Sequence, residues 1–205
     1  MLLSPDKVQY VDYLPVRCPI GVAAFPRDFQ GTSLVWSNTS GYPADKTYRE
    51  FYRDIGYDLP MEYIKPYIHE PAVRVFTGYK YWAITGHTDQ KVPYQRSEAQ
   101  KKVVEHARNF IYNLKKKGRQ LSAAMDAEPL YTLAYDAELF GHWWFEGIDW
   151  LEQVIRLAAV QGEEISLVTP SLFLSREGAD LQTVRPAFSS WGQGGYSAVW
   201  LDGSN

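Results

Sequence analysis

The order of secondary-structure signals in the second half of the chain constrains its fold more than any other feature. A short apolar run, Leu130 to Ala134, predicts a buried strand over residues 130–136. A helical pattern follows over 148–161, where apolar residues recur at spacings of three and four, and residues 165–169 predict a second strand. Strand, helix, strand implies a parallel sheet with a right-handed crossover, so we expect an α/β fold.

The first half of the chain predicts further elements. Residues 97–117 show the clearest helical pattern, with the spacing of a capping box at its start and Gly118 after its end. A shorter helix is expected over 46–55, with Asp45 as its N-cap and Gly56 after it. Residues 72–86 read as strand followed by a turn.

A carboxylate, Asp136, stands where the 130–136 strand ends and the loop to the next helix begins. In α/β barrels this edge carries the chemistry, because side chains from several strand ends converge there. Trp143 and Trp144 lie in the same loop and offer flat apolar faces that suit the C–H faces of sugar rings. The pattern therefore suggests a carbohydrate enzyme.

Composition excludes several other classes of function. The 205 residues fit one ordinary domain, and the net charge of −3 comes with no basic run except Lys115–Lys117 at a helix end, so nucleic-acid binding is not expected. No segment has the length of a membrane span, and the start of the sequence lacks the features of a signal peptide. Cys18 is the single cysteine, which fits a reducing compartment and a cytoplasmic location.

No metal or cofactor site is expected. The four histidines show none of the usual ligand spacings. The glycine-rich loop at 192–195 is not a phosphate loop, because no Lys-Ser/Thr pair follows it. The unusual feature is instead the aromatic fraction of 15%, with seven tryptophans, the residues that line sugar clefts.

Three blocks carry a family resemblance. Ala134–Gly147 resembles the fourth conserved region of glycoside hydrolase family 57, in the form used by its α-1,4-glucan branching enzymes. Gly41–Gly56 is similar to the family segment between nucleophile and acid/base, and Ser189–Gly195 with Trp200 resembles a loop that carries substrate-binding tryptophans. The resemblance runs from about residue 14 to the C-terminus.

The resemblance implies a fold and a set of site residues. Residues 1–180 would form the later part of a distorted (β/α)7 barrel, and residues 181–205 a glycine- and tryptophan-rich substrate loop that leads to an absent helical domain. Asp136 would be the general acid/base of a retaining mechanism. The implied substrate-binding residues are His142, Trp143, Trp144, Trp191 and Trp200.

The same resemblance implies that the nucleophilic glutamate lies on an earlier strand, and no residue of this sequence matches it. Retaining transfer needs two carboxyl groups about 5–5.5 Å apart. The chain alone is therefore expected to be an inactive fragment, and a separate chain that supplies the N-terminal half of the barrel is a candidate partner. Its 130–136 and 165–169 strands are expected to lie parallel, with one sheet edge unpaired.

Each candidate residue has a structural alternative. Asp136 is a possible cap of the next helix, Glu138 a possible salt-bridge partner, and His142 a possible core residue. At least one of Trp143 and Trp144 is expected in the core, because adjacent side chains diverge. Packing alone also accounts for Trp191 and Trp200 in their loop, and it is the favoured role of Trp36 and Trp82.

Three functions are consistent with these residues. The first is branching of an α-glucan, in which a sugar hydroxyl replaces water as acceptor and apolar walls limit water; burial of Asp136 against Trp143 and Trp144 would raise its pKa for this role. The second is hydrolysis or 4-α-glucan transfer by a related enzyme. The third is a non-catalytic polypeptide that binds glucan or completes a partner.

Overall fold

The computed structural model describes residues 10, 12–70, 73–125, 127–160, 164–177, 181–190, 197–201 and 203. The chain folds into two compact units. The first comprises Met1–Gln30, Gly118–Ala134 and Val168–Asn205, and the second comprises Gly31–Lys117 and Tyr135–Leu167.

The first unit is organised around a short hairpin. Strand β1 (Val16–Arg17) pairs antiparallel with β2 (Ala23–Ala24), with Val16 opposite Ala24. The chain reverses between them through Gly21, whose φ of 85° lies in the left-handed region that glycine adopts without steric cost. On its other side Arg17 forms a parallel bridge with Thr183, so β1 lies between two extended neighbours.

The predicted strands at 130–136 and 165–169 are wrong, because neither forms a strand. Within the first unit, Thr132 makes an isolated parallel bridge with Arg27, and the amide of Leu130 donates to the carbonyl of Tyr13. A strand needs a continuous partner, whereas these backbone groups bond to single residues of a loop. The described residues therefore do not form the predicted parallel sheet. The prediction that one edge of that sheet is unpaired fails with it.

The remaining elements of the first unit are two short helices, α6 (Pro170–Glu177) and α7 (Ala198–Leu201). Its buried apolar side chains come from segments far apart in sequence: Val16, Cys18, Met125, Phe173 and Val184.

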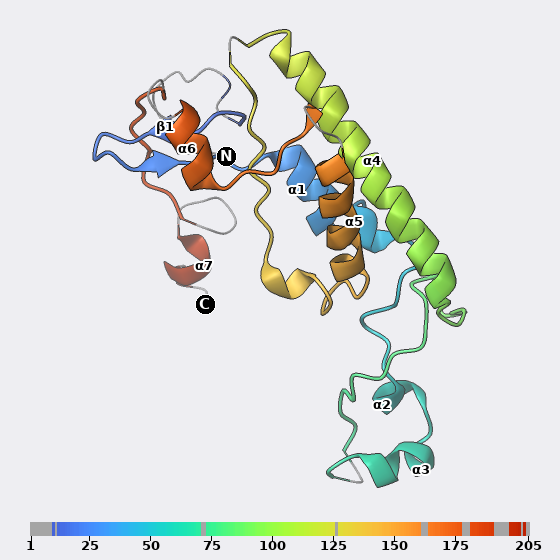
Figure 1. Cartoon of the computed structure of the whole chain (residues 1–205). Coiled ribbons are helices and arrows are strands. Elements are labelled where there is room, and N and C mark those ends of the chain that lie inside the picture. The colour runs from blue at the N-terminus through green and yellow to red at the C-terminus, as the bar shows by residue number, and fades with distance from the viewer. Residues whose placement is uncertain are drawn as a thin grey trace. The chain divides into compact units, whose positions relative to one another are not determined.

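The core of the second unit lies where α1 (Phe29–Trp36), α4 (Arg96–Ser122) and α5 (Gly147–Val160) contribute buried side chains. In Figure 1, α5 lies alongside α4, and the rings of Phe110 and Trp150 meet edge to face with centroids 5.0 Å apart. The buried residues of α4 recur at spacings of three and four: Ala99, Val103, Ala107, Phe110 and Ile111. The two helices match the predicted patterns because one stripe of each is apolar.

The ends of α4 differ from the prediction. The helix begins at Arg96, and it continues through Gly118 to Ser122. A glycine inside a helix costs only about 1 kcal/mol relative to alanine, and residues 119–121 are good helix formers. Gly118 therefore does not end the helix.

The helix predicted over 46–55 does not form. Instead, a 3₁₀ turn η1 (Tyr42–Ala44) ends at Asp45, and residues 46–50 run antiparallel to 82–85. The amide of Glu50 donates to the carbonyl of Trp82, and the amide of Ile84 donates to that of Tyr48. Aromatic residues in this segment favour extended backbone, so cross-strand pairing overrides the helical spacing. Over the described residues, the predicted 72–86 strand does not form as a continuous strand, but residues 81–85 are extended and pair with 46–50 on one side and with 92–94 on the other.

A side loop follows, with three one-turn elements: α2 (Ile55–Asp58), α3 (Met61–Ile64) and η2 (Lys65–Tyr67). Asp54 closes this loop. Its carboxylate, 1% exposed, accepts hydrogen bonds from the amides of Gly56, Thr77 and Gly78 and from the Thr77 hydroxyl, at 2.7–3.0 Å. Burial acts to raise the pKa of Asp54, but these hydrogen bonds outweigh it and hold the pKa below its ordinary value. Asp54 is therefore a structural residue that holds the two ends of the loop together.

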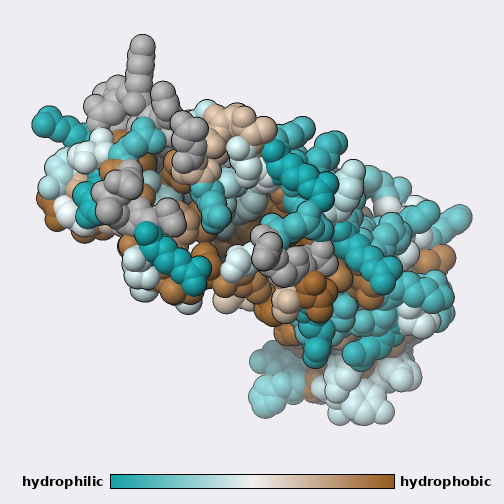
Figure 2. Space-filling view, turned by 45° about the horizontal axis from the view of Figure 1, so that its top comes forward, coloured by the Kyte–Doolittle hydropathy of each residue, from teal (hydrophilic) through white to brown (hydrophobic). Residues whose placement is uncertain are grey.

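Hydrophilic residues dominate the face shown in Figure 2, and hydrophobic residues lie between them in separate patches. None of the helices in the described part of the chain combines the length and apolar character needed to cross a membrane.

Candidate active site

Asp136 lies in the second unit, at the point where an extended segment turns into the 3₁₀ helix η3 (Ala137–Leu139). It occupies the N-cap position with extended backbone, yet its side chain makes no capping hydrogen bond. The carboxylate is exposed. The capping alternative is therefore wrong, and the Asp136 carboxylate is accessible to a ligand.

The loop after η3 is held by its own backbone. The amide of Trp144 donates to the carbonyl of Leu139 at 2.8 Å, and Gly141 donates to Trp144 at 2.8 Å. Gly141 has a φ of 88°, and a Cβ there would lie 2.7 Å from the side chain of Ile148. Glycine thus permits a tight reversal that points Trp143 and Trp144 in different directions.

Trp143 belongs to a cluster of four rings that we call the aromatic face: Phe51, Tyr52, His142 and Trp143. Trp143 is 47% exposed and stacks on Phe51 with centroids 4.6 Å apart and planes inclined by 28°. His142 stands edge-on to both rings, and Tyr52, 66% exposed, stands edge-on to Phe51. Such a surface presents flat apolar rings with polar edges to solvent.

Trp144 is a core residue. It is 2% exposed, and the centroid of its ring lies 5.5 Å from that of Tyr48 and 5.4 Å from that of Trp150. The expectation that one of the two adjacent tryptophans lies in the core is confirmed. Its ring offers no face to a ligand, so the predictions that Trp144 contacts substrate and that both rings bury Asp136 are corrected.

Glu146 connects the loop to the segment that carries Phe51. Its side chain is 1% exposed, and one carboxylate oxygen accepts from the amide of Arg49 at 3.1 Å. The Arg49 guanidinium lies 3.7 Å from the centroid of the Phe145 ring. Burial raises the pKa of Glu146, and its hydrogen bonds lower the pKa by a smaller amount, so the pKa lies above its ordinary value. Arg49 and Glu146 therefore join the two stretches of chain on which the aromatic face is built.

Sequence reasoning singled out neither Phe51 nor Glu146. Phe51 stood inside a predicted helix, and its pairing with Trp143 depends on the reversal at Gly141 and on the extended course of residues 46–50. Trp36, assigned to packing, is 48% exposed, whereas Trp82 is half-buried. No apolar–polar alternation marks residues 46–52, so no local sequence signal indicated the extended backbone.

The other predicted tryptophans are separated from this loop in the sequence. Trp191 falls outside the described residues. Trp200 lies in α7 of the first unit and is 67% exposed, an exposure consistent with a ligand contact. Among the described histidines, cysteines, aspartates and glutamates, no group of three or more is placed to hold a metal ion.

Comparison with solved structures finds a close likeness. The α-amylase AmyC from Thermotoga maritima superposes with a TM-score of 0.84 and 43% identity, covering 92% of this chain and 37% of AmyC. A GH57-type branching enzyme from the hyperthermophilic archaeon Pyrococcus horikoshii gives a TM-score of 0.77 at 32% identity, covering 92% of this chain and 32% of that enzyme.

Comparison with curated sequences gives the same family. The 1,4-alpha-glucan branching enzyme TK1436 of Thermococcus kodakarensis is 32% identical over 184 residues, which is 87% of this chain. The chain spans about a quarter of that relative's length (24%), and it spans about a third of the solved structures. A search against models of protein families found no match.

Proposed function

The chain belongs to glycoside hydrolase family 57, and from this we propose that it contributes the general acid/base of an α-1,4-glucan branching enzyme. Asp136 would protonate the leaving glycosidic oxygen and then accept the proton of the incoming sugar hydroxyl. One observation carries the proposal: an exposed carboxylate without a capping bond begins the loop that builds the aromatic face.

The aromatic face would bind the glucan. The exposed parts of Trp143 and Tyr52 offer stacking surfaces for glucose rings, while His142 supplies a polar edge. Stacking on an aromatic ring limits the access of water, which favours a sugar acceptor. We propose Trp200 and Trp191 as additional glucan contacts, because Trp200 is exposed and both belong to the tryptophan-rich segment.

The second carboxylate is proposed to come from outside these 205 residues. Double displacement in a retaining enzyme requires a nucleophile about 5–5.5 Å from the acid/base. The family resemblance assigns that role to a glutamate on an earlier strand, which this sequence does not contain. We propose that residues 1–180 complete a (β/α)7 barrel with that missing part, supplied by a separate chain or by a longer form of this one.

Hydrolysis is a second candidate. The relative with 43% identity is described as an α-amylase, so likeness in this segment does not separate water from sugar as the acceptor. The aromatic face favours the sugar, because its exposed rings offer an apolar stacking surface. A non-catalytic role, glucan binding or completion of a partner, fits the chain in isolation. No cofactor is proposed, and a cytoplasmic location remains a prediction.

Iodine staining of amylose separates these functions. The purified chain is incubated with amylose, alone and together with a polypeptide that supplies the N-terminal part of a family 57 barrel. The proposal expects no change alone and, with the added part, a fall in iodine absorbance without release of reducing sugar. Reducing sugar in proportion to the fall would assign hydrolysis. Turnover by the chain alone would reveal an internal nucleophile, with Glu138 as the first residue to test.

A further inference from the structure

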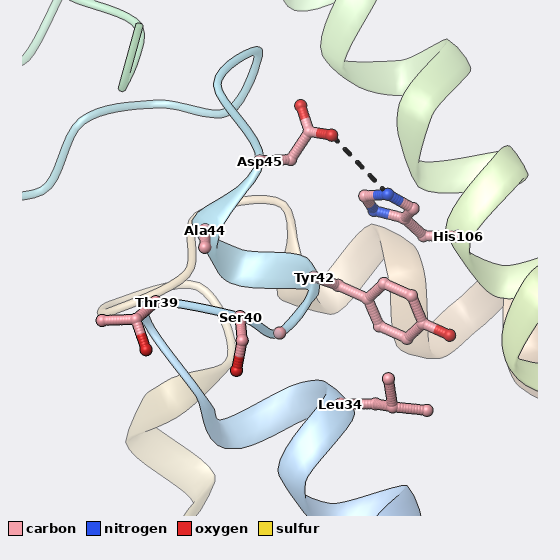
Figure 3. A pocket seen from close by; sticks show the side chains of 8 residues that line it. Leu34, Thr39, Ser40, Tyr42, Ala44, Asp45 and His106 are labelled. Atoms are coloured by element: carbon pink, nitrogen blue, oxygen red, sulfur yellow. Dashed lines mark ion pairs between the residues drawn. The ribbon is translucent and has the colours of Figure 1, made fainter. Parts of the chain in front are cut away.

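An open pocket of about 250 Å³ lies in the second unit, between α1, η1 and α4 (Figure 3). None of the residues that line it belongs to the aromatic face, and Asp136 is not among them. Side chains of mixed character form its wall: Leu34, Thr39, Ser40, Tyr42, Ala44, Asp45 and His106, with Gly41.

Asp45 and His106 lie next to each other in the lining of this pocket (Figure 3). The His106 Nε2 atom lies 3.7 Å from Asp45 Oδ2, too far for a direct hydrogen bond. The other oxygen of Asp45 is already used, since it accepts from the amide and hydroxyl of Thr47 at 2.9 Å and 2.7 Å. A separation of this kind suits a bridging group that bonds to both atoms.

The protonation of His106 follows from its second contact. Its Nδ1 atom lies 2.8 Å from the hydroxyl of Tyr48, which is fully buried. The Tyr48 hydroxyl hydrogen is buried and needs an acceptor, and Nδ1 lies within its reach, so we assign the phenol as the donor to Nδ1. Burial lowers the pKa of His106, so the ring is neutral at pH 7. Nε2 therefore carries the hydrogen and is a donor toward Asp45.

We propose that this pocket binds one hydroxylated sugar ring, with a ring hydroxyl donating to Asp45 Oδ2 and accepting from His106 Nε2. A hydroxyl is both donor and acceptor, which this pair of atoms requires. An ammonium group would leave the Nε2 hydrogen without an acceptor, and a phosphate would face the Asp45 carboxylate. The choice of a glucosyl unit among such rings rests on the proposed function.

The rest of the lining fits the same ligand. Thr39 and Ser40 are exposed and place their hydroxyls on the rim, where the Ser37 hydroxyl bonds to both at 3.2 Å and 2.9 Å. Leu34 and Ala44 offer an apolar surface for the C–H face of a ring. Pockets for drug-sized ligands span about 300–1,000 Å³, so a smaller, open pocket suits a single ring.

The charges around the pocket disfavour an anion. Beside His106 on α4, Lys102 and Glu105 form an ion pair at 2.7 Å. The charges of Lys102, Glu105 and Asp45 all interact electrostatically with His106, and the charge of Lys102 also interacts with that of Asp45. With His106 neutral, Asp45 and Glu105 outnumber Lys102 by one negative charge, which disfavours an anionic ligand, and the Nε2 hydrogen, which needs an acceptor, disfavours a cation.

Imidazole NMR signals of the 205-residue chain test this proposal, because each of the four histidines reports on its own position. Maltose is expected to shift the His106 signals with a Kd in the millimolar range. Asp45→Asn should weaken this binding about tenfold, since a hydrogen bond to a charged group is lost. Ser40→Ala, on the exposed rim, should weaken it less. Asp89→Asn, the same change at an exposed site outside the pocket, should leave it unaltered.

Two further probes decide between ligand classes and sites. Inorganic phosphate and ethanolamine should leave His106 unmoved, and a larger shift with either than with maltose overturns the proposal. Maltoheptaose should move both His106 and His142. Movement of His142 alone overturns the sugar pocket and leaves the proposed function standing. Movement of His106 alone supports the pocket as a hydroxylated-ring site and counts against the aromatic face as a glucan site.

Discussion

Asp54 and Asp136 lie in the same unit but in opposite surroundings. Asp54 is 1% exposed and accepts four hydrogen bonds from Gly56, Thr77 and Gly78. Asp136 is exposed and makes no capping bond. The chain uses the whole acceptor capacity of Asp54 to close a loop, whereas it leaves the carboxylate of Asp136 available. The difference separates a structural carboxylate from one that can exchange a proton with a ligand.

The two adjacent tryptophans repeat this contrast, and the largest expected effect concerns the buried one. Trp144→Ala should lower the free energy of unfolding by about 3–5 kcal/mol, because it removes a ring packed against Tyr48 and Trp150. Urea unfolding followed by circular dichroism measures this. A loss below about 1 kcal/mol would mean that Trp144 is not part of the core.

The next largest effect is expected at Asp54. Asp54→Ala should cost about 3 kcal/mol, because it leaves the Gly56, Thr77 and Gly78 amides without their acceptor. The matched control is Asp89→Ala, which removes an exposed carboxylate and should change stability by less than about 0.5 kcal/mol.

The pH dependence of Asp54 has a definite sign. Its folded pKa is lowered, so its contribution is complete above its unfolded pKa of about 3.9 and is lost as pH falls through the folded value. Asp54→Asn should therefore flatten the acid limb of the stability curve below about pH 4. An unchanged acid limb would contradict the lowered pKa.

Glu146 should show the opposite sign and a smaller effect. Burial raises its folded pKa, so stability falls as pH rises from the unfolded pKa of about 4.3 through the folded value. Glu146→Gln keeps an acceptor for the Arg49 amide and removes this loss. The variant should be more stable than the parent at pH 8 and close to it at pH 4. The same difference in unfolding free energy between variant and parent at pH 8 and at pH 4 would contradict the raised pKa of Glu146.

The smallest change in stability among the rings is expected at Trp143. Trp143→Ala should leave the Tm nearly unchanged, because the ring is 47% exposed, but weaken binding of maltoheptaose about fivefold. Isothermal titration calorimetry measures the affinity. A large fall in Tm with unchanged affinity would place Trp143 with Trp144 as a structural residue.

Sequence alone predicted the features that depend on local periodicity. The α4 and α5 helices have a long apolar stripe, so spacing was enough to find them. The position of Asp136 at the start of a loop also followed from the pattern and the family resemblance. The sequence also predicted that at least one of Trp143 and Trp144 lies in the core, because adjacent side chains diverge, but it did not say which.

The features that depend on distant contacts were missed. Residues 46–55 have helical spacing, but pairing with 82–85 makes their first part extended, which brings Phe51 under Trp143. Residues 130–136 have the composition of a strand, but their partners are single loop residues. Neither outcome is visible in a window of local sequence, because hydrogen-bond partners more than 30 residues away decide both.

Asp136→Asn tests the central claim most directly, in the chain combined with the N-terminal part of the barrel. The measured quantity is the kcat for amylose, with the Tm recorded beside it. The account predicts a loss of about 10²–10⁴-fold, as expected for a missing general acid/base, with a Tm close to that of the parent because the exposed carboxylate holds no bond in the loop. Undiminished turnover, or a loss that follows a fall in Tm like that of Asp54→Ala, would contradict the assignment of Asp136.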